Sequence, residues 1–131
     1  MADYISYARS NYFHVKDDEQ FEDFLDKYGV EYRKDDDGMY AMFPEEDWPS
    51  FSLYNDDTGD WEEVDFEGEL GSHLADGSVA ILQHIGHEKM RYLGGYSTAV
   101  RSDGEVLSVS ISDIYARVKN EWNLQATFAE Y

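Results

Sequence analysis

Apolar side chains near the N-terminus recur at the spacing i, i+3, i+4, i+7, which is typical of an amphipathic helix. They are Phe21, Phe24, Leu25 and Tyr28. Asp17 followed by Gln20 matches a capping box, and Gly29 is a residue that often terminates helices. We therefore expect a helix between Asp17 and Gly29, with its polar face exposed to solvent.

Runs of aromatic and β-branched residues elsewhere indicate strands separated by Gly- and Asp-containing turns. We expect these strands at 4–15, with a break near Ser10 and Asn11, and at 30–32, 39–43, 50–54, 78–85, 90–100 and 106–111. Residues 34–38 end in Asp-Gly and indicate a hairpin connection, and a second acidic turn follows at 55–59.

Two segments complete the predicted elements. From Asp60 to Leu70 the pattern fits a strand, or partly a helix continuing to Leu74, and we favour a strand followed by a short helix. Ser112 is expected to cap a last helix, and we expect two aromatic residues to fix the C-terminal tail. The apolar side of that helix would be Ile114, Tyr115 and Val118, and the tail anchors Trp122 and Phe128.

These elements predict an α+β fold with an antiparallel sheet and two or three short α-helices. At 131 residues and 42% hydrophobic content, we expect a single domain over 1–131, with an antiparallel meander and helix at 78–122. We expect a cytoplasmic protein, because no apolar stretch is long enough for a membrane span and no secretory leader is recognisable. The absence of cysteine excludes disulfides and thiolate sites.

Charge is concentrated in one part of the chain. The net charge is −19, and residues 17–69 contribute −18 of it, with 21 acidic side chains against three basic ones. Adaptation to high salt would spread carboxylates over the whole surface, and solubility needs a net charge of only about 2–8. The excess in 17–69 therefore indicates a surface directed at a basic partner.

The amount of charge is comparable to that of nucleic acid. Duplex DNA carries one charge per ~1.7 Å of axis, so 18 charges correspond to roughly 31 Å, about one helical turn. If Asp65, Glu67 and Glu69 alternate on a strand, they project on one side at roughly 6.6–6.8 Å intervals, like successive phosphates. A rigid protein with such a surface could occupy a nucleic-acid site competitively.

The chain resembles a class of small, strongly acidic proteins. Acidic pairs lie beside aromatic residues in Tyr54-Asn55-Asp56-Asp57 and in Asp60-Trp61-Glu62-Glu63, and the chain lacks cysteine. In these respects it is similar to the DNA-mimicking anti-CRISPR and anti-restriction proteins of phages and plasmids. The resemblance implies an inhibitor in the host cytoplasm whose partner is a CRISPR surveillance complex or a restriction enzyme.

Other chemistries have weaker support. The acidic loops 35–38 and 55–60 could bind a divalent ion, but an EF-hand spacing would put Arg33 or Tyr54 at the first ligand position. His84, His87 and Glu88 lie at a predicted strand end, where structural or surface histidines are the commoner outcome. No catalytic motif occurs, so we expect no enzyme activity, cofactor or metal site.

Tyrosines at strand spacing have two interpretations, as sheet packing or as base-stacking platforms. They are Tyr4, Tyr7, Tyr12, Tyr92 and Tyr96. We expect packing, because so acidic a chain would repel a phosphate backbone, which also argues against direct nucleic-acid binding.

The leading hypothesis is a nucleic-acid mimic that occupies the site of a basic nucleic-acid-binding protein or ribonucleoprotein of host defence. The predicted contact residues are Glu19, Glu22, Asp23, Asp26, Asp35, Asp36, Asp37, Asp56, Asp57, Glu62, Glu63, Asp65, Glu67 and Glu69. Two alternatives stay open: an acidic adaptor that sequesters a basic partner unrelated to nucleic acid, and a protein or enzyme that depends on a divalent cation.

Overall fold

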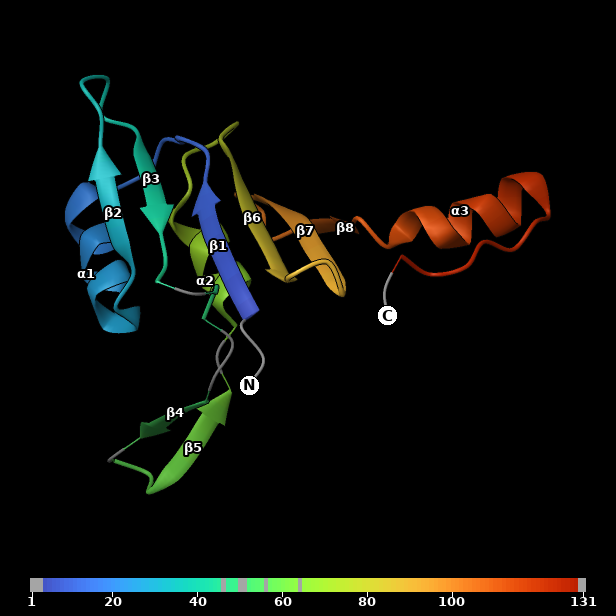
Figure 1. The fold of residues 1–131 in the computed structure, drawn as a ribbon. Coiled ribbons are helices and arrows are strands. Elements are labelled where there is room, and N and C mark those ends of the chain that lie inside the picture. Colours follow the sequence, from blue (N-terminus) through green and yellow to red (C-terminus); the bar gives the residue numbers. More distant parts are fainter. Residues whose placement is uncertain (1–3, 46, 50–51, 56, 64, 130–131) are drawn as a thin grey trace.

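Two layers, a four-stranded sheet and a helical layer, enclose most of the core (Figure 1). The computed structural model describes residues 4–45, 47–49, 52–55, 57–63 and 65–129, with the backbone alone at 4, 52–55 and 62–63. Its elements are β1 (Tyr4–Ser10), α1 (Asp18–Tyr28), β2 (Glu31–Lys34), β3 (Tyr40–Phe43), β4 (Ser52–Asn55), β5 (Asp60–Glu63), α2 (Phe66–His73), β6 (Val79–Glu88), β7 (Tyr92–Arg101), β8 (Val106–Ser110) and α3 (Asp113–Trp122).

The main sheet has the order β1-β6-β7-β8, with every neighbouring pair antiparallel. Strands β2 and β3 form one hairpin, and β4 and β5 form another that stands away from the body (Figure 1). The β2–β3 hairpin is joined to the main sheet beyond the end of β1, where Phe13 and Tyr40 exchange two backbone hydrogen bonds of 2.9 Å. The predicted α+β class with an antiparallel sheet is confirmed.

Helix α1 begins and ends where the sequence predicts. The Asp17 carboxylate accepts a hydrogen bond from the Gln20 backbone N–H at 2.9 Å, and Gly29 adopts φ 68°, which a residue without a Cβ tolerates best. The four apolar residues of the predicted stripe are all buried. The aromatic centre of the core is formed by the rings of Phe21, Phe24 and Tyr28 together with those of Phe13, Tyr40 and Phe66.

The segment after Asp60 has the order favoured from the sequence, a strand followed by a short helix, here β5 and α2. The helix starts early enough to include residues 66–69, because Asp65 caps α2 by accepting a hydrogen bond from the Gly68 backbone N–H at 3.1 Å. Along a helix, residues two apart point about 200° away from each other. Asp65, Glu67 and Glu69 therefore do not form a row on one face, and the comparison of that row with successive phosphates is wrong.

The C-terminal expectations are also corrected in part. Ser112 occupies the N-cap position of α3, but its side chain makes no capping hydrogen bond. Trp122 does not fix the tail, since its side chain is 71% exposed, whereas Phe128 packs on the Tyr115 ring with centroids 4.8 Å apart. No residue of α3 is buried.

The two faces of the main sheet differ in how they are covered. The inner face contributes Ala80, Leu82 and Val100 to the core. The side chains that alternate with these residues form the second face, which we call the outer face. Its exposed apolar residues include Ile5, Tyr7, Ile85, Leu93, Leu107, Val109 and Ile111. None of the helices in the described part of the chain combines the length and apolar composition needed to cross a bilayer.

Candidate acidic interaction surface

The acids of α1 divide between two sides of the helix. Glu22 turns towards the β2–β3 hairpin, where its carboxylate accepts hydrogen bonds from the hydroxyls of Tyr32, at 3.1 Å, and Tyr40. Glu19, Asp23 and Asp26 lie on the exposed side, at the i, i+4, i+7 spacing of one helical face. Among the described residues, no Lys, Arg or His lies within ion-pair distance of these three carboxylates.

The β2–β3 turn adds two more exposed carboxylates beside the start of α1. Lys34 ends β2 and its Nζ lies 2.6 Å from the Asp18 carboxylate, which brings the turn to the N-terminal end of the helix. Asp36 and Asp37 are exposed in that turn. We call the resulting surface the acidic belt; its members are Glu19, Asp23, Asp26, Asp36 and Asp37.

Asp35 belongs to the same turn but has a structural role. Its Oδ1 accepts hydrogen bonds from the backbone N–H groups of Asp37, at 3.0 Å, and Met39, at 2.8 Å. The carboxylate therefore holds the turn closed, in the manner of an Asx turn. Simultaneous charge reversal of all three turn aspartates would alter the turn together with its charge, so a clean test should leave Asp35 in place.

Helix α2 carries predicted contact residues that are engaged in the fold. Glu69 accepts a hydrogen bond from the Tyr28 hydroxyl at 2.7 Å and lies 3.5 Å from Lys27 Nζ. Burial is the main cause that raises the pKa of Tyr28 above its ordinary value, and the bond to Glu69 adds to it. Glu67 is half-buried on the same helix, so α2 offers less accessible charge than α1.

Four of the fourteen predicted contact residues serve the fold, and five form the acidic belt. The four are Glu22, Asp35, Asp65 and Glu69. Asp57 is exposed in the β4–β5 hairpin, away from α1, while Asp56 and the side chains of Glu62 and Glu63 lie outside the described residues. The structure thus brings together the helix and β2–β3 turn acids, and separates them from the second hairpin.

The histidines and acidic loops supply no described metal site. Nε2 of the buried His84 lies 4.0 Å from the Asp47 carboxylate, which also accepts a hydrogen bond from the Tyr96 hydroxyl at 2.7 Å. His73 packs against Phe24 with ring centroids 4.8 Å apart, and burial lowers its pKa. Within the described ranges, no three His, Asp or Glu side chains are grouped as a metal site requires.

The exposure of the outer face was not predicted from the sequence, and its tyrosine, Tyr7, was expected to pack in the core or on the surface of the sheet. Tyr7 is 65% exposed, and Tyr12, Tyr92 and Tyr96 are also exposed, so they do not belong to the core; the Tyr4 side chain lies outside the described part. The sequence does contain one sign that the outer face is apolar. Strand β6 has apolar residues at both inward and outward positions, as in a sheet that is covered on both faces.

No protein family, curated protein or solved structure was found to match this chain.

Proposed function

We propose that the chain inhibits a nucleic-acid-binding protein of host defence, a CRISPR effector complex or a restriction enzyme in the host cytoplasm, by placing the acidic belt in its basic site. The observation that carries this proposal is the row Glu19, Asp23 and Asp26, exposed on one side of α1 with no described cation within ion-pair distance. Folding does not need this row, because the core side of the same helix supplies the packing.

Helical geometry sets how closely the row can imitate a phosphate backbone. At 1.5 Å per residue, the rise from Glu19 to Asp26 is about 10.5 Å, an average of about 5 Å between three carboxylates. One DNA strand has a phosphate every ~3.4 Å of axis. Because the row is sparser than a strand, we expect Asp36 and Asp37 of the adjacent turn to be needed as well.

Electrostatics then determine how such a complex should form. A concentrated negative surface accelerates encounter with a site whose Lys and Arg are already arranged for phosphates. Exposed charges are screened beyond about 8 Å at physiological salt, so binding should weaken strongly as salt rises. Inhibition should accordingly be competitive with nucleic acid and sensitive to ionic strength.

The experiment is a competition assay on purified partners. Proteins captured from a host lysate by the tagged chain in 0.1 M NaCl are purified, and the displacement of fluorescent duplex DNA or guide RNA from each is followed by anisotropy. We expect displacement by the native chain and at least about 10-fold weaker displacement by a belt variant, Glu19→Gln, Asp23→Asn, Asp26→Asn, Asp36→Asn and Asp37→Asn.

A matched control removes five exposed acids elsewhere, Glu45→Gln, Asp60→Asn, Asp76→Asn, Glu105→Gln and Glu121→Gln, and should displace nucleic acid as the native chain does. Partners that bind the chain and nucleic acid at the same time would contradict mimicry and favour the acidic adaptor. Equal potency of the belt variant and the native chain would contradict the assignment of the belt.

A further inference from the structure

The outer face of the main sheet is an uncovered apolar surface in a very acidic protein. Near its centre, the residues that pair across neighbouring strands carry no charge: Tyr7 pairs with Ile85, and Ile85 pairs with Gly95. A Cβ built on Gly95 would meet Ile85 at 3.4 Å and Ile111 at 3.7 Å, so the three positions border one hollow. That hollow has a volume of about 370 Å³.

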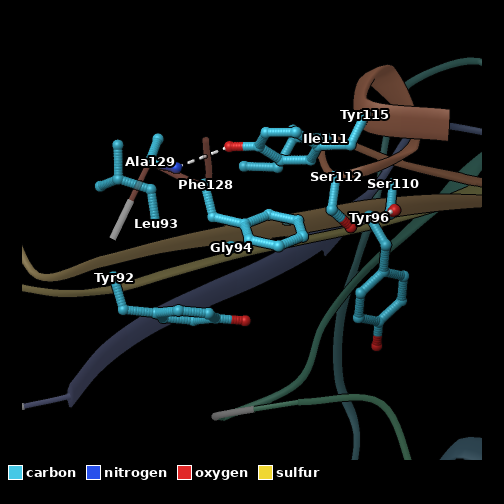
Figure 2. Close-up of a pocket in the computed structure, with 11 residues that line it drawn as sticks. Tyr92, Leu93, Gly94, Tyr96, Ser110, Ile111, Ser112, Tyr115, Phe128 and Ala129 are labelled. Atoms are coloured by element: carbon cyan, nitrogen blue, oxygen red, sulfur yellow. Dashed lines mark hydrogen bonds between the residues drawn. The ribbon is translucent and has the colours of Figure 1, made fainter. Parts of the chain in front are cut away.

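The C-terminal arm, residues 112–129, is equally uncovered. Helix α3 extends from the end of β8 away from the sheet (Figure 1), and within the described residues its contacts include the tail that folds back along it. The Tyr115 hydroxyl accepts a hydrogen bond from the Ala129 N–H at 2.8 Å, next to a hollow of about 400 Å³ between the arm and its own sheet (Figure 2). A ten-residue helix that buries nothing is marginal in water, so the arm needs a packing partner.

The apolar area of these two surfaces is large enough for a stable dimer. Aromatic side chains bury ~150–250 Å² and aliphatic ones ~60–120 Å² when fully covered, as their transfer energies imply. Scaled by their exposure, the seven outer-face residues and four of the arm expose roughly 800 Å². The arm residues counted are Ile114, Trp122, Leu124 and Phe128. Each partner in a standard interface buries ~800 Å² in total, so the two surfaces together supply an area of that size.

We infer that two copies of this chain associate, with the arm of each copy lying across the outer face of the other. The dimensions agree: α3 is about 15 Å long, and the distance from β1 to β8 across three strand spacings is about 14 Å. Ile114, Val118 and Trp122 lie within an arc of about 80° on α3 and form a stripe that can face the sheet. Trp122 is the residue best suited to fill the hollow at Gly95 of the other copy.

The distribution of charge identifies a second copy as the occupant. Of the residues at outward positions on the main sheet, from β1 through β8, Arg9, His87 and Arg101 can carry positive charge and none is acidic. The acidic belt lies on α1 and the β2–β3 turn, at the end of the molecule opposite α3 (Figure 1). Contact through the outer faces therefore keeps the two most acidic regions apart, and the same patch on both subunits satisfies a two-fold interface.

Molar mass measures this association directly. Light scattering on the full chain at about 50 μM should give about 30 kDa, twice the 15.2 kDa of one copy. Trp122→Glu should shift the mass towards one copy and raise the dissociation constant at least about 100-fold. The matched control is Trp61→Glu, since Trp61 is equally exposed, at 70% against 71%, but lies on the separate β4–β5 hairpin. Circular dichroism of each variant verifies that it folds.

Crosslinking distinguishes the arm exchange from other contacts, because the chain contains no cysteine. A tagged Ile85→Cys chain mixed with an untagged Val118→Cys chain should form a mixed disulfide under mild oxidation, whereas Trp61→Cys in place of Val118→Cys should not. A mass of one copy at 50 μM for the native chain would overturn the inference. A two-copy mass without the mixed disulfide, or with no response to Trp122→Glu, would overturn the exchange of arms.

Discussion

Neutralising the exposed row of α1 should stabilise the protein, although it removes the charges to which we assign function. The perturbation is the triple variant Glu19→Gln, Asp23→Asn and Asp26→Asn, which keeps side-chain size and removes three negative charges. All three residues are exposed and lack a described cation partner. The variant therefore removes repulsion without breaking an ion pair that the structure describes.

The magnitude follows from the spacing along the helix. Four like-charged pairs disappear, at positions 19–22, 19–23, 22–26 and 23–26, and each costs about 0.2–0.5 kcal/mol at i,i+3 or i,i+4. One favourable i,i+4 pair, Asp23 with Lys27, is lost as well and offsets about one of these four. Removing the Asp26 charge from the last turn relieves an unfavourable interaction with the helix dipole of about 0.3–1 kcal/mol, and removing the Glu19 charge from the first turn loses a favourable one of similar size. The dipole contributions nearly cancel, which leaves a stabilisation of roughly 0.5–1.5 kcal/mol.

Urea unfolding followed by circular dichroism measures this difference. The midpoint should rise in 20 mM salt, and the gain should shrink in 0.5 M salt, since the Debye length falls to a few ångströms as salt approaches 1 M. A triple variant less stable than the native chain in low salt would refute the reasoning, because it would show that the row supports the fold. A gain independent of salt would refute its electrostatic origin.

Three further predictions concern residues that serve the fold. Glu22→Ala removes the acceptor for two tyrosine hydroxyls and should lower the free energy of unfolding by about 1–3 kcal/mol in urea melts, and an unchanged midpoint would contradict this role. Phe66→Ala empties a site whose ring lies 5.2 Å from Phe24 and 5.5 Å from Tyr28, so it should cost about 3–5 kcal/mol by the same measurement, and a loss below 1 kcal/mol would contradict tight packing there. Burial lowers the pKa of His73, so the folded state binds fewer protons than the unfolded state; its contribution to stability is complete above pH ~6.5 and is lost as the pH falls below that value. Melts at pH 7.5 and 5.5 should therefore show less loss on acidification in His73→Gln than in the native chain, and an equal loss in both would contradict the assignment.

Locally encoded features of the fold could be predicted from the sequence. The Asp17 cap, the apolar stripe of α1 and Gly29 all act within one helix, so their pattern was sufficient. The order of strand and helix after Asp60 was predicted, but their boundary was left open because Phe66 and Leu70 satisfy both a strand and a helix period; the capping hydrogen bond of Asp65 sets where the helix begins. Capping geometry depends on backbone angles that an alternating pattern does not specify.

The negative charge of the candidate site could be predicted from the sequence, but which of its acids support the fold and which are free to contact a partner could not. Glu22 and Asp23 are adjacent acids in the sequence, yet one accepts from two tyrosines and the other faces solvent, which depends on tertiary contacts to β2 and β3. The exposure of the outer face could not be predicted either, since outward apolar residues such as Ile85 and Leu107 have the same sequence pattern whether or not another layer covers them.

The hydrogen bonds from Tyr32 and Tyr40 to Glu22 fix the rotation of α1 about its own axis. Because the rotation of the helix is fixed, its carboxylates point in fixed directions before a partner binds. Docking then restricts only side-chain torsions, so less conformational entropy is lost than if the backbone also had to become ordered. Four of the five belt residues are aspartate, which has one rotatable bond fewer than glutamate. Exchanging these aspartates for glutamate would keep every charge, yet it should weaken binding, because each carboxylate could then occupy a wider range of positions.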